Sequence, residues 1–466
     1  MVIYKLKGVT LMNKEKIYGV FEHEGKEYPF ALENQILTIP QIPFQYSKDF
    51  ADIEHIEAIQ GVTNSNRDIV FLGCEVLGHS RIPFATEIKM SVLGYILLSS
   101  SRCTFDRIDF YSEAINGFYS PRNAYDVELN EDRTGIVGIK VRNWEIYKKD
   151  FQCLVNKEAV QLGLNVYLNV NLAWEKEQLG TAKSIMSMSF ADKKKPNDVL
   201  DYYLYVRDFL ESVNFQKNIP LERIELFEKL DTGKYERRGK VVIFQADSSE
   251  YVPSILHSIT FIDVTSESFP ILFSQIAEKR LSNNHNPFFY PESRREDRVV
   301  DTSKWLNTAI CFEGEFNTFF PEYRAKNDSL FHDAKTLLLD TINSAVQKSG
   351  KSINNKQNNA LNSFKSLIDH ADTTIKQKFE VCMASYEYEM SEAIHRICLS
   401  CGVPKDADLA GIYASYRNQT AHGVIRRPED CDVATYRILR GFIYVMNLKR
   451  ANIPADRIKE IIGRMF

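Results

Sequence analysis

Three polar residues near the C-terminal end of the chain, Arg417, Asn418 and His422, have the types and spacing for chemistry at a phosphate group. An imidazole exchanges protons near neutral pH, because its unperturbed pKa is about 6.5. A guanidinium keeps its charge and its planar fork matches two phosphate oxygens at once. Such a set could hold a phosphate and move a proton beside it. A solvated surface histidine with no chemical role is the plain alternative.

The helix that must position these residues is predicted over residues 406–422, with Asp406 as its N-cap and a glycine directly after it. One face of this helix is apolar, since five residues recur at helical spacing: Leu409, Ile412, Tyr413, Tyr416 and Thr420. Asn418 and His422 are four positions apart and fall on the opposite face, with Arg417 at the flank. The histidine is therefore expected to point away from the core.

Two other segments resemble functional motifs but lack the required setting. Arg280 and His285 repeat the Arg-x4-His spacing at a predicted helix end that runs into a loop, so we assign this match to chance and expect alanine at either position to change nothing. Residues 345–352 end like a phosphate-binding P-loop. That motif needs a glycine where Ala345 stands and a strand before it, so Gly350 is interpreted as a helix stop.

A pair of cysteines, Cys398 and Cys401, raises the alternative of a zinc site, with His395 one turn earlier. A structural zinc site needs four ligands, and no second Cys-x-x-Cys or histidine pair follows. Cys382 and Cys431 could complete a set only through the fold. Cysteine is often buried, and Cys398 continues the apolar stripe of its helix, so packed thiols are the favoured interpretation and no metal or cofactor is expected.

The wider pattern predicts an α+β multidomain protein. Residues 1–263 contain short alternating runs such as 164–170, separated by turns, which predict a β-rich domain of the sandwich or barrel type. In residues 264–466 the apolar period becomes helical, and the helices are expected to form an all-α bundle. The longest of them is predicted from Ile375 to Ile397, with apolar residues every three or four positions.

Composition limits the class of protein. The 466 residues are 44% hydrophobic and 26% charged, as in ordinary globular proteins. The densest apolar run, at 90–98, is far shorter than the roughly 20 residues of a membrane span, and no signal peptide is expected. Scattered cysteines are typical of reduced thiols, so a cytoplasmic location is expected. The net charge of −4 conceals a mild basic excess after Phe331 and an acidic excess before it.

The Arg-Asn-x-x-x-His segment, its glycine stop and the long helices before and after it resemble the Arg-x4–6-His motif of HEPN ribonuclease domains. The resemblance extends over residues 264–466. The β-rich first half, from the early hairpin through Phe71 to Phe110 and Tyr111, resembles the N-terminal domain of ApeA-type bacterial anti-phage proteins, in which a HEPN domain follows. This second resemblance rests on architecture more than on fixed residues.

The resemblance implies a metal-independent endoribonuclease in which the 2′-hydroxyl of RNA attacks the adjacent phosphorus. His422 would be the general acid/base, Arg417 the phosphate clamp, and Asn418 would position the phosphate or His422. Because one helix face supplies few groups, the family usually pairs two motifs across a homodimer. The expected contacts to the RNA backbone come from four arginines: Arg426, Arg427, Arg437 and Arg440.

The same resemblance implies a role in anti-phage defence by abortive infection, with host RNA as substrate and tRNA as one candidate. The N-terminal domain would sense a phage-derived trigger and regulate the nuclease, and no membrane partner is expected. Two alternatives stay open from the sequence. The helical domain could be a non-catalytic binding or assembly module, or Cys398 and Cys401 could support a zinc-dependent hydrolase.

Overall fold

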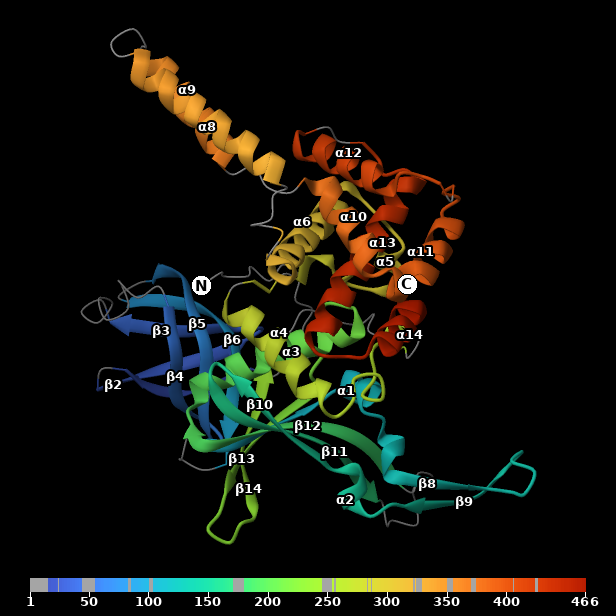
Figure 1. The fold of residues 1–466 in the computed structure, drawn as a ribbon. Coiled ribbons are helices and arrows are strands. Elements are labelled where there is room, and N and C mark those ends of the chain that lie inside the picture. Colours follow the sequence, from blue (N-terminus) through green and yellow to red (C-terminus); the bar gives the residue numbers. More distant parts are fainter. Residues whose placement is uncertain are drawn as a thin grey trace. The chain divides into compact units, whose positions relative to one another are not determined.

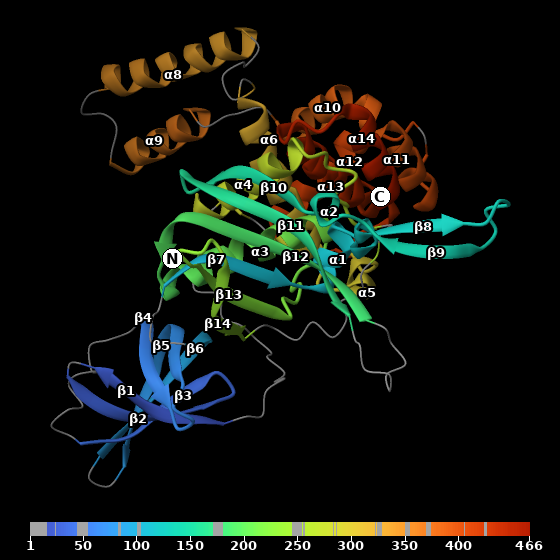
Figure 2. The same ribbon diagram turned by 90° about the horizontal axis from the view of Figure 1, so that it is seen from below.

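The chain folds into two compact units, Met1–Asp297 and Arg298–Phe466, which are described separately (Figures 1 and 2). The fold comes from a computed structural model, which describes residues 16–23, 25–43, 55–82, 85–99, 104–170, 180–244, 254, 257–282, 284–285, 287–321, 323, 329–349, 355–369, 374–404, 406–423 and 426–466. No helix in these ranges is long and apolar enough to cross a membrane.

The first six strands of the N-terminal unit close into an antiparallel barrel, in the order β6-β3-β2-β1-β4-β5 and back to β6. They are β1 (Ile17–His23), β2 (Lys26–Glu33), β3 (Ile36–Pro43), β4 (His55–Thr63), β5 (Asp68–Ile82) and β6 (Ala85–Leu98). Alternate residues point inward, as a strand with one buried face requires. The barrel core includes Phe21, Phe30, Leu37, Phe71 and Met90, each buried almost completely.

Two glycines allow β1 and β4 to pair and so close the barrel. A Cβ atom at Gly19 would lie 2.1 Å from the backbone oxygen of Val62, and one at Gly61 would lie 2.7 Å from that of Val20. Both distances are well below any van der Waals contact, so a side chain at either position would separate the strands. The closure therefore depends on glycine at these two positions.

A second antiparallel sheet continues from the barrel strand β6 through β14, in the order β14-β13-β7-β12-β11-β10. Its strands are β7 (Phe105–Tyr111), β10 (Lys149–Val155), β11 (Glu158–Val170), β12 (Gly180–Lys194), β13 (Arg223–Lys229) and β14 (Tyr235–Ile243). Three helices pack with it: α1 (Glu113–Phe118), α3 (Val199–Asn214) and α4 (Ser268–Leu281). Ring pairs among Phe118, Phe209 and Phe269, at 5.1–5.6 Å between centroids, join them.

The remaining elements of the N-terminal unit are short. They comprise η2 (Pro121–Ala124), β8 (Tyr125–Leu129), β9 (Ile136–Val141), α2 (Trp144–Tyr147), η3 (Pro196–Asp198), η5 (Pro287–Phe289) and α5 (Arg294–Asp297). The compact units divide after Asp297, whereas the sequence predicts a boundary after residue 263. The difference arises because α4 has a helical pattern but packs against α3 and β10.

The C-terminal unit is helical throughout its described secondary structure. Its helices are α6 (Thr302–Phe319), α8 (Ser329–Ser349), α9 (Asn355–Asp369), α10 (Ile375–Ser385), α11 (Glu387–Ser400), α12 (Leu409–Ala421), α13 (Asp430–Arg450) and α14 (Ala455–Met465). Its core centres on α13, around Phe442, which packs against Phe312 and Phe379. The predicted α+β class, with a barrel-type β-rich part before an all-α part, is confirmed.

Two predicted helices differ in detail from the observed ones. The helix predicted over Ile375–Ile397 breaks at Tyr386, whose φ and ψ of −120° and 23° end α10 before α11 begins. The helix that carries Arg417 begins at Leu409, and its N-cap is Asp408 in place of Asp406, because the Asp408 carboxylate accepts the backbone N–H of Gly411 at 2.8 Å.

Candidate functional site

Helix α12 is held in the bundle by two buried tyrosines, and this fixes the direction of the polar residues that follow them. Tyr413 and Tyr416 are fully buried, with ring centroids 5.6 and 4.7 Å from that of Trp305 on α6. Asn418 and His422 are rotated by roughly half a turn about the helix axis from these tyrosines, so their side chains must leave the helix on the side away from the core. The predicted orientation of Asn418 and His422 is confirmed, since both are exposed.

Arg417 is anchored by a carboxylate that the sequence analysis did not assign. Its Nε donates to Oε1 of Glu313 on α6 at 3.0 Å, and its Nη2 lies 3.4 Å from Oε2. The arginine side chain is 28% exposed and that of Glu313 20%, so the guanidinium is oriented without being enclosed. The signal in the sequence was an acidic residue interrupting the apolar stripe of the α6 helix.

Tyr413 borders this ion pair from the core side. Burial raises the pKa of its hydroxyl well above the ordinary value, and the negative charge of Glu313 raises it further. The phenol therefore stays protonated at neutral pH. Tyr413 contributes packing and a neutral hydroxyl to this region, and it does not compete with His422 as a proton acceptor.

His422 caps the C-terminal end of α12 and presents its imidazole to solvent. Its backbone N–H bonds to the carbonyl of Asn418 at 3.1 Å, and Gly423 follows with a φ of +82°, the left-handed conformation typical of a helix end. Within the described part of the chain, no hydrogen bond or ion pair engages the side chains of Asn418 or His422. Both groups are therefore available to a ligand.

Arg426, predicted to contact RNA, has extensive partners within the protein. Its Nη1 and Nη2 lie 2.7 and 3.1 Å from the two carboxylate oxygens of Asp432, and its guanidinium stacks 4.5 Å from the centroid of the Tyr416 ring. Its carbonyl accepts hydrogen bonds from Tyr416 and Thr302, each at 3.1 Å. The geometry favours a structural role, in which Arg426 fastens the segment after α12 to the bundle.

The other three predicted RNA contacts differ in accessibility. Arg427 is exposed, and Arg437 is half-buried with Nη1 3.2 Å from Oγ of Ser400. Arg440 is only 3% exposed, and its guanidinium lies 5.0 Å from the ring centroid of Tyr436. A guanidinium that is buried to this extent is poorly placed to contact a phosphate backbone, so the structure gives no support to the prediction for Arg440. Sequence spacing alone did not reveal that α13 is the central helix of the bundle.

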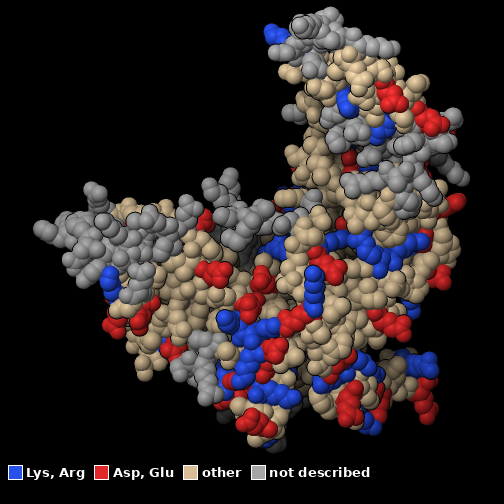
Figure 3. Space-filling model, turned by 60° about the vertical axis from the view of Figure 1, so that its left-hand side comes forward, with Lys and Arg blue, Asp and Glu red and all other residues tan. Residues whose placement is uncertain are grey.

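Charge on the molecular surface is mixed. Figure 3 shows Lys and Arg interspersed with Asp and Glu on the face in view.

The cysteine pair does not gather a set of metal ligands from the described residues. Burial raises the pKa of the Cys398 thiol, and Cys401 has Sγ 3.8 Å from Nη1 of Arg437. A group of three potential ligands occurs once within the described ranges, and it contains neither cysteine. The zinc alternative therefore lacks its third ligand in the described structure.

The Arg280 and His285 pair, assigned to chance from the sequence, lies in a buried charged cluster of the N-terminal unit. Asp208 on α3 is fully buried, and its Oδ2 lies 3.4 Å from Nε of Arg280 and 3.5 Å from Nε2 of His285. Nη2 of Arg207 lies 3.1 Å from the other oxygen of Asp208. Alanine at Arg280 would remove one of the two arginines that pair with this buried carboxylate and should lower the free energy of unfolding, so these residues are poor controls for activity.

Asp208, Glu211 and His285 place potential ligand atoms within 4.8 Å of one another, which raises the question of a metal ion. The charges argue against one. Arg207 and Arg280 already balance the two carboxylates, and a dication would give this buried region an uncompensated positive charge. We therefore interpret the cluster as a structural ion network between α3 and the segment after α4.

The cluster makes stability depend on pH in two opposing ways. Burial raises the pKa of Glu211 to about 7, so its stabilising protonation is complete below its unfolded value of about 4.5 and is lost as pH rises through 7. Burial lowers the pKa of His285 to about 4, so its contribution is present above about 6.5 and is lost as pH falls to 4.

In His285→Asn only the Glu211 dependence remains, so we expect acidification from pH 7 to 5 to raise the free energy of unfolding of this variant more than that of the parent chain. Glu211→Gln should show the reverse sign between pH 6.5 and 4. Urea denaturation at several pH values measures both slopes. If the free energy of unfolding changes with pH in the same way for the parent and both variants, the prediction is contradicted, because the two groups would then have similar pKa values in the folded and unfolded chain.

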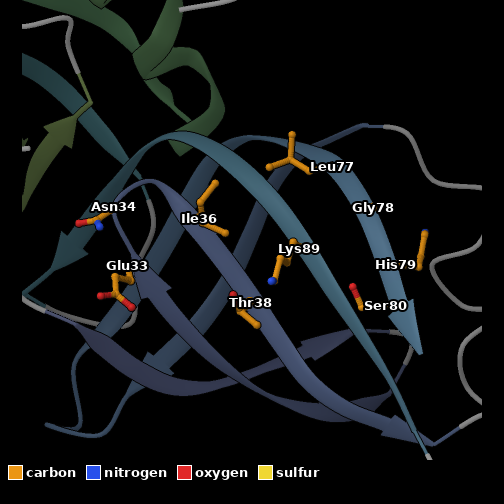
Figure 4. Close-up of a pocket in the computed structure, with 9 residues that line it drawn as sticks. All are labelled: Glu33, Asn34, Ile36, Thr38, Leu77, Gly78, His79, Ser80 and Lys89. Atoms are coloured by element: carbon orange, nitrogen blue, oxygen red, sulfur yellow. The ribbon is translucent and has the colours of Figure 1, made fainter. Parts of the chain in front are cut away.

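An open groove of about 540 Å³ lies on the barrel between β3, β5 and β6 (Figure 4). Thr38 and Lys89 are paired across β3 and β6 in its floor, and Leu77 and His79 lie along its β5 side. Their side chains are of mixed character and face solvent. No buried polar group converges on the groove among the residues that line it, so it identifies no ligand.

Comparisons with known proteins bring no external assignment: no family model, no curated protein and no solved structure matches the chain.

Proposed function

We propose that the protein is a metal-independent endoribonuclease whose active site is formed by Arg417, Asn418 and His422. The observation that carries the proposal is the arrangement at the end of α12. An oriented guanidinium and an exposed imidazole follow one another within a helical turn and a half, and the imidazole has no protein partner in the described structure. Proton transfer and phosphate binding are the two requirements of RNA cleavage by its own 2′-oxygen.

In the proposed reaction, His422 takes the proton of the 2′-hydroxyl, and the 2′-oxygen attacks the adjacent phosphorus. The bond from phosphorus to the 5′-oxygen of the next nucleotide breaks. The products are a 2′,3′-cyclic phosphate and a 5′-hydroxyl, which receives a proton from an imidazolium. Arg417 stabilises the negative charge that develops on the phosphorane oxygens, and Asn418 donates a hydrogen bond to the phosphate or to His422.

The ion pair with Glu313 fits this scheme as a positioning device. Glu313 engages Nε and Nη2 of Arg417, and the guanidinium still has further N–H groups for a phosphate oxygen. A preoriented donor loses less conformational freedom on binding than a mobile side chain. The pair also neutralises Glu313, which would otherwise repel the RNA.

The biological role that we propose follows the resemblance to HEPN domains and ApeA-type proteins. The nuclease would act in the cytoplasm on host RNA, with tRNA as one candidate, and would halt phage infection by abortive infection. It would function as a homodimer that brings two Arg417 and His422 sets to one cleft. The N-terminal unit would sense a phage-derived trigger and control the nuclease.

A second candidate is a non-catalytic binding or assembly module. The pair between Arg417 and Glu313 favours it, because an arginine that joins α12 to α6 is also what a purely structural role would require. The two candidates differ in the importance of His422, which makes no such contact.

The direct test is to incubate the purified full chain with total RNA and to compare it with His422→Ala. The matched control is His395→Ala, which removes another exposed histidine of the same helical unit. We expect fragments with 5′-hydroxyl ends from the parent chain and from His395→Ala only. Equal cleavage by all three proteins would assign the activity to a contaminant or to another site.

We expect the N-terminal unit to restrain or direct the nuclease, because the proposed catalytic groups lie wholly in the C-terminal unit. A chain beginning at Arg298 should be more toxic to cells than the full chain, or should cut RNA with less selectivity. The start at Arg298 keeps α4 with α3 and β10, to which it packs. Growth after induction and the fragment pattern measure the effect. Equal toxicity and equal patterns would contradict a regulatory role.

A further inference from the structure

The β8–β9 hairpin of the N-terminal unit is a two-stranded sheet separate from the large sheet. Its register pairs Tyr125 with Val141, Val127 with Ile139, and Leu129 with Ile136. It extends away from the neighbouring strands in both ribbon views (Figures 1 and 2). An isolated two-stranded hairpin is at best marginally stable in water, so its stability depends on what its two faces contact.

One face of the hairpin is entirely apolar and uncovered. Because side chains alternate along a strand and cross-strand partners share a face, the apolar residues of β8 and β9 gather on the same side. They are 47–68% exposed: Val127, Leu129, Ile136, Val137, Ile139 and Val141. The register shifts between Glu128 and Leu129, which leaves Val137 as the extra residue of a bulge beside Ile136. Val137 therefore lies on the same face as the other apolar residues.

The opposite face is charged and satisfied within the hairpin. Nε of Arg142 lies 2.6 Å from Oδ1 of Asp126, and Lys140 forms an ion pair with Glu128. The charges of this face are thus balanced in cross-strand pairs. The hairpin has one face suited to water and one suited to burial.

The uncovered surface has the size that a specific interface needs. Six aliphatic residues at these exposures present on the order of 500 Å² of apolar surface, within the roughly 300–600 Å² of the largest, often functional, patches on monomers. A standard interface buries about 800 Å² per partner, of which roughly 60% is apolar. The hairpin face alone therefore matches the apolar part of such an interface.

We propose that this apolar face is an interface between two copies of the chain, related by a two-fold axis. An apolar sheet face can pack against a second copy of itself, and sheets packed face to face lie about 10 Å apart with their side chains interdigitated. No charged side chain lies on the face, so the symmetric contact brings no like charges together. The ion-paired faces stay outermost, in water.

This interface does not depend on the ribonuclease proposal, because the hairpin lies in the N-terminal unit and contributes no catalytic group. If the helical unit also self-associates, the hairpin provides a second, separate contact between copies.

The test is sedimentation velocity of the full chain over a range of concentrations, with Ile139→Glu and Lys140→Gln compared with the parent. Ile139 lies in the centre of the apolar face, and Lys140 is its neighbour on the charged face. Ile139→Glu places two like charges at the interface and should weaken one association step by at least about 100-fold. Lys140→Gln should associate like the parent. Ile139→Thr, which keeps the strand preference, should weaken association less.

Two further measurements make the result decisive. At a concentration low enough for the parent to be monomeric, thermal unfolding should give the same midpoint for Ile139→Glu as for the parent, because residue 139 is exposed in the single chain. Ile139→Cys should form a disulfide between copies under mild oxidation, and Lys140→Cys should not. The proposal is overturned if the parent and Ile139→Glu sediment identically at all concentrations, or if the two cysteine variants cross-link equally.

Discussion

Alanine at His422 should lower the rate of RNA cleavage by about 10²–10⁴-fold, the usual contribution of a general acid or base. The fold should be unaffected, because the imidazole is exposed at the end of α12 and has no side-chain partner in the described structure. Single-turnover cleavage of a defined RNA measures the loss, and the thermal unfolding midpoint reports the fold. Toxicity in cells should disappear with the activity.

Arg417→Ala should cause a loss of similar size, and here a conservative change is informative. Lysine keeps the charge but not the planar fork, so Arg417→Lys should recover little activity if the arginine clamps a phosphate in two places. Glu313→Gln preserves the guanidinium and removes only its anchor, so it should weaken catalysis less than Arg417→Ala. If Arg417 had only a structural role, Arg417→Ala and Glu313→Gln would both lower the free energy of unfolding. The rate of cleavage would then fall in proportion to the loss of folded protein.

The matched control for these variants is His395→Ala, for which we expect full activity. The Arg280 and His285 variants do not serve as controls, because both residues belong to the buried network around Asp208. If His422→Ala and Arg417→Ala are folded and cleave RNA like the parent chain, the site assignment is wrong.

Local patterns in the sequence correctly predicted the class of each half of the chain and the apolar face of α12, because alternation and helical spacing record which side is buried. The partner of Arg417 could not be derived in this way. Glu313 lies on another helix, 104 positions earlier, and only the packing of α12 against α6 brings them together. The sequence showed at most that an acidic residue interrupts an apolar stripe.

The burial of Arg440 and the network around His285 were missed for the same physical reason. A charged residue has the same local pattern whether it faces water or a partner from another element, and its burial depends on which helix becomes central. α4 shows the related limit for domain boundaries. Its helical period resembles that of the following bundle, yet Phe269 packs among Phe118 and Phe209 of the β-rich unit. Contacts between elements decide such boundaries.

Cleavage should require the 2′-hydroxyl at the scissile position. The proposed site contains one imidazole, one guanidinium and one amide. The nearby carboxylate of Glu313 is paired with Arg417 and belongs to no group of three metal ligands in the described structure. Because these groups form no set of ligands for a metal-bound water, we propose that the nucleophile is the substrate's own 2′-oxygen, whose proton His422 takes. An RNA with one 2′-deoxy or 2′-O-methyl group at that position should be cut at least about 10³-fold more slowly than the unmodified RNA.

The same reasoning fixes the products and the effect of chelators. The 5′ fragment should end in a 2′,3′-cyclic phosphate, which mass spectrometry distinguishes from a linear phosphate by the mass of one water. EDTA should leave the rate unchanged, since neither proton transfer by His422 nor charge stabilisation by Arg417 involves a metal. The matched control is an RNA with the 2′-deoxy group one nucleotide away, which keeps the nucleophile and should be cut normally. Activity that is lost in EDTA and restored by Mg²⁺ or Zn²⁺ would contradict the mechanism, because a metal-activated water would then be the nucleophile and a linear phosphate the product.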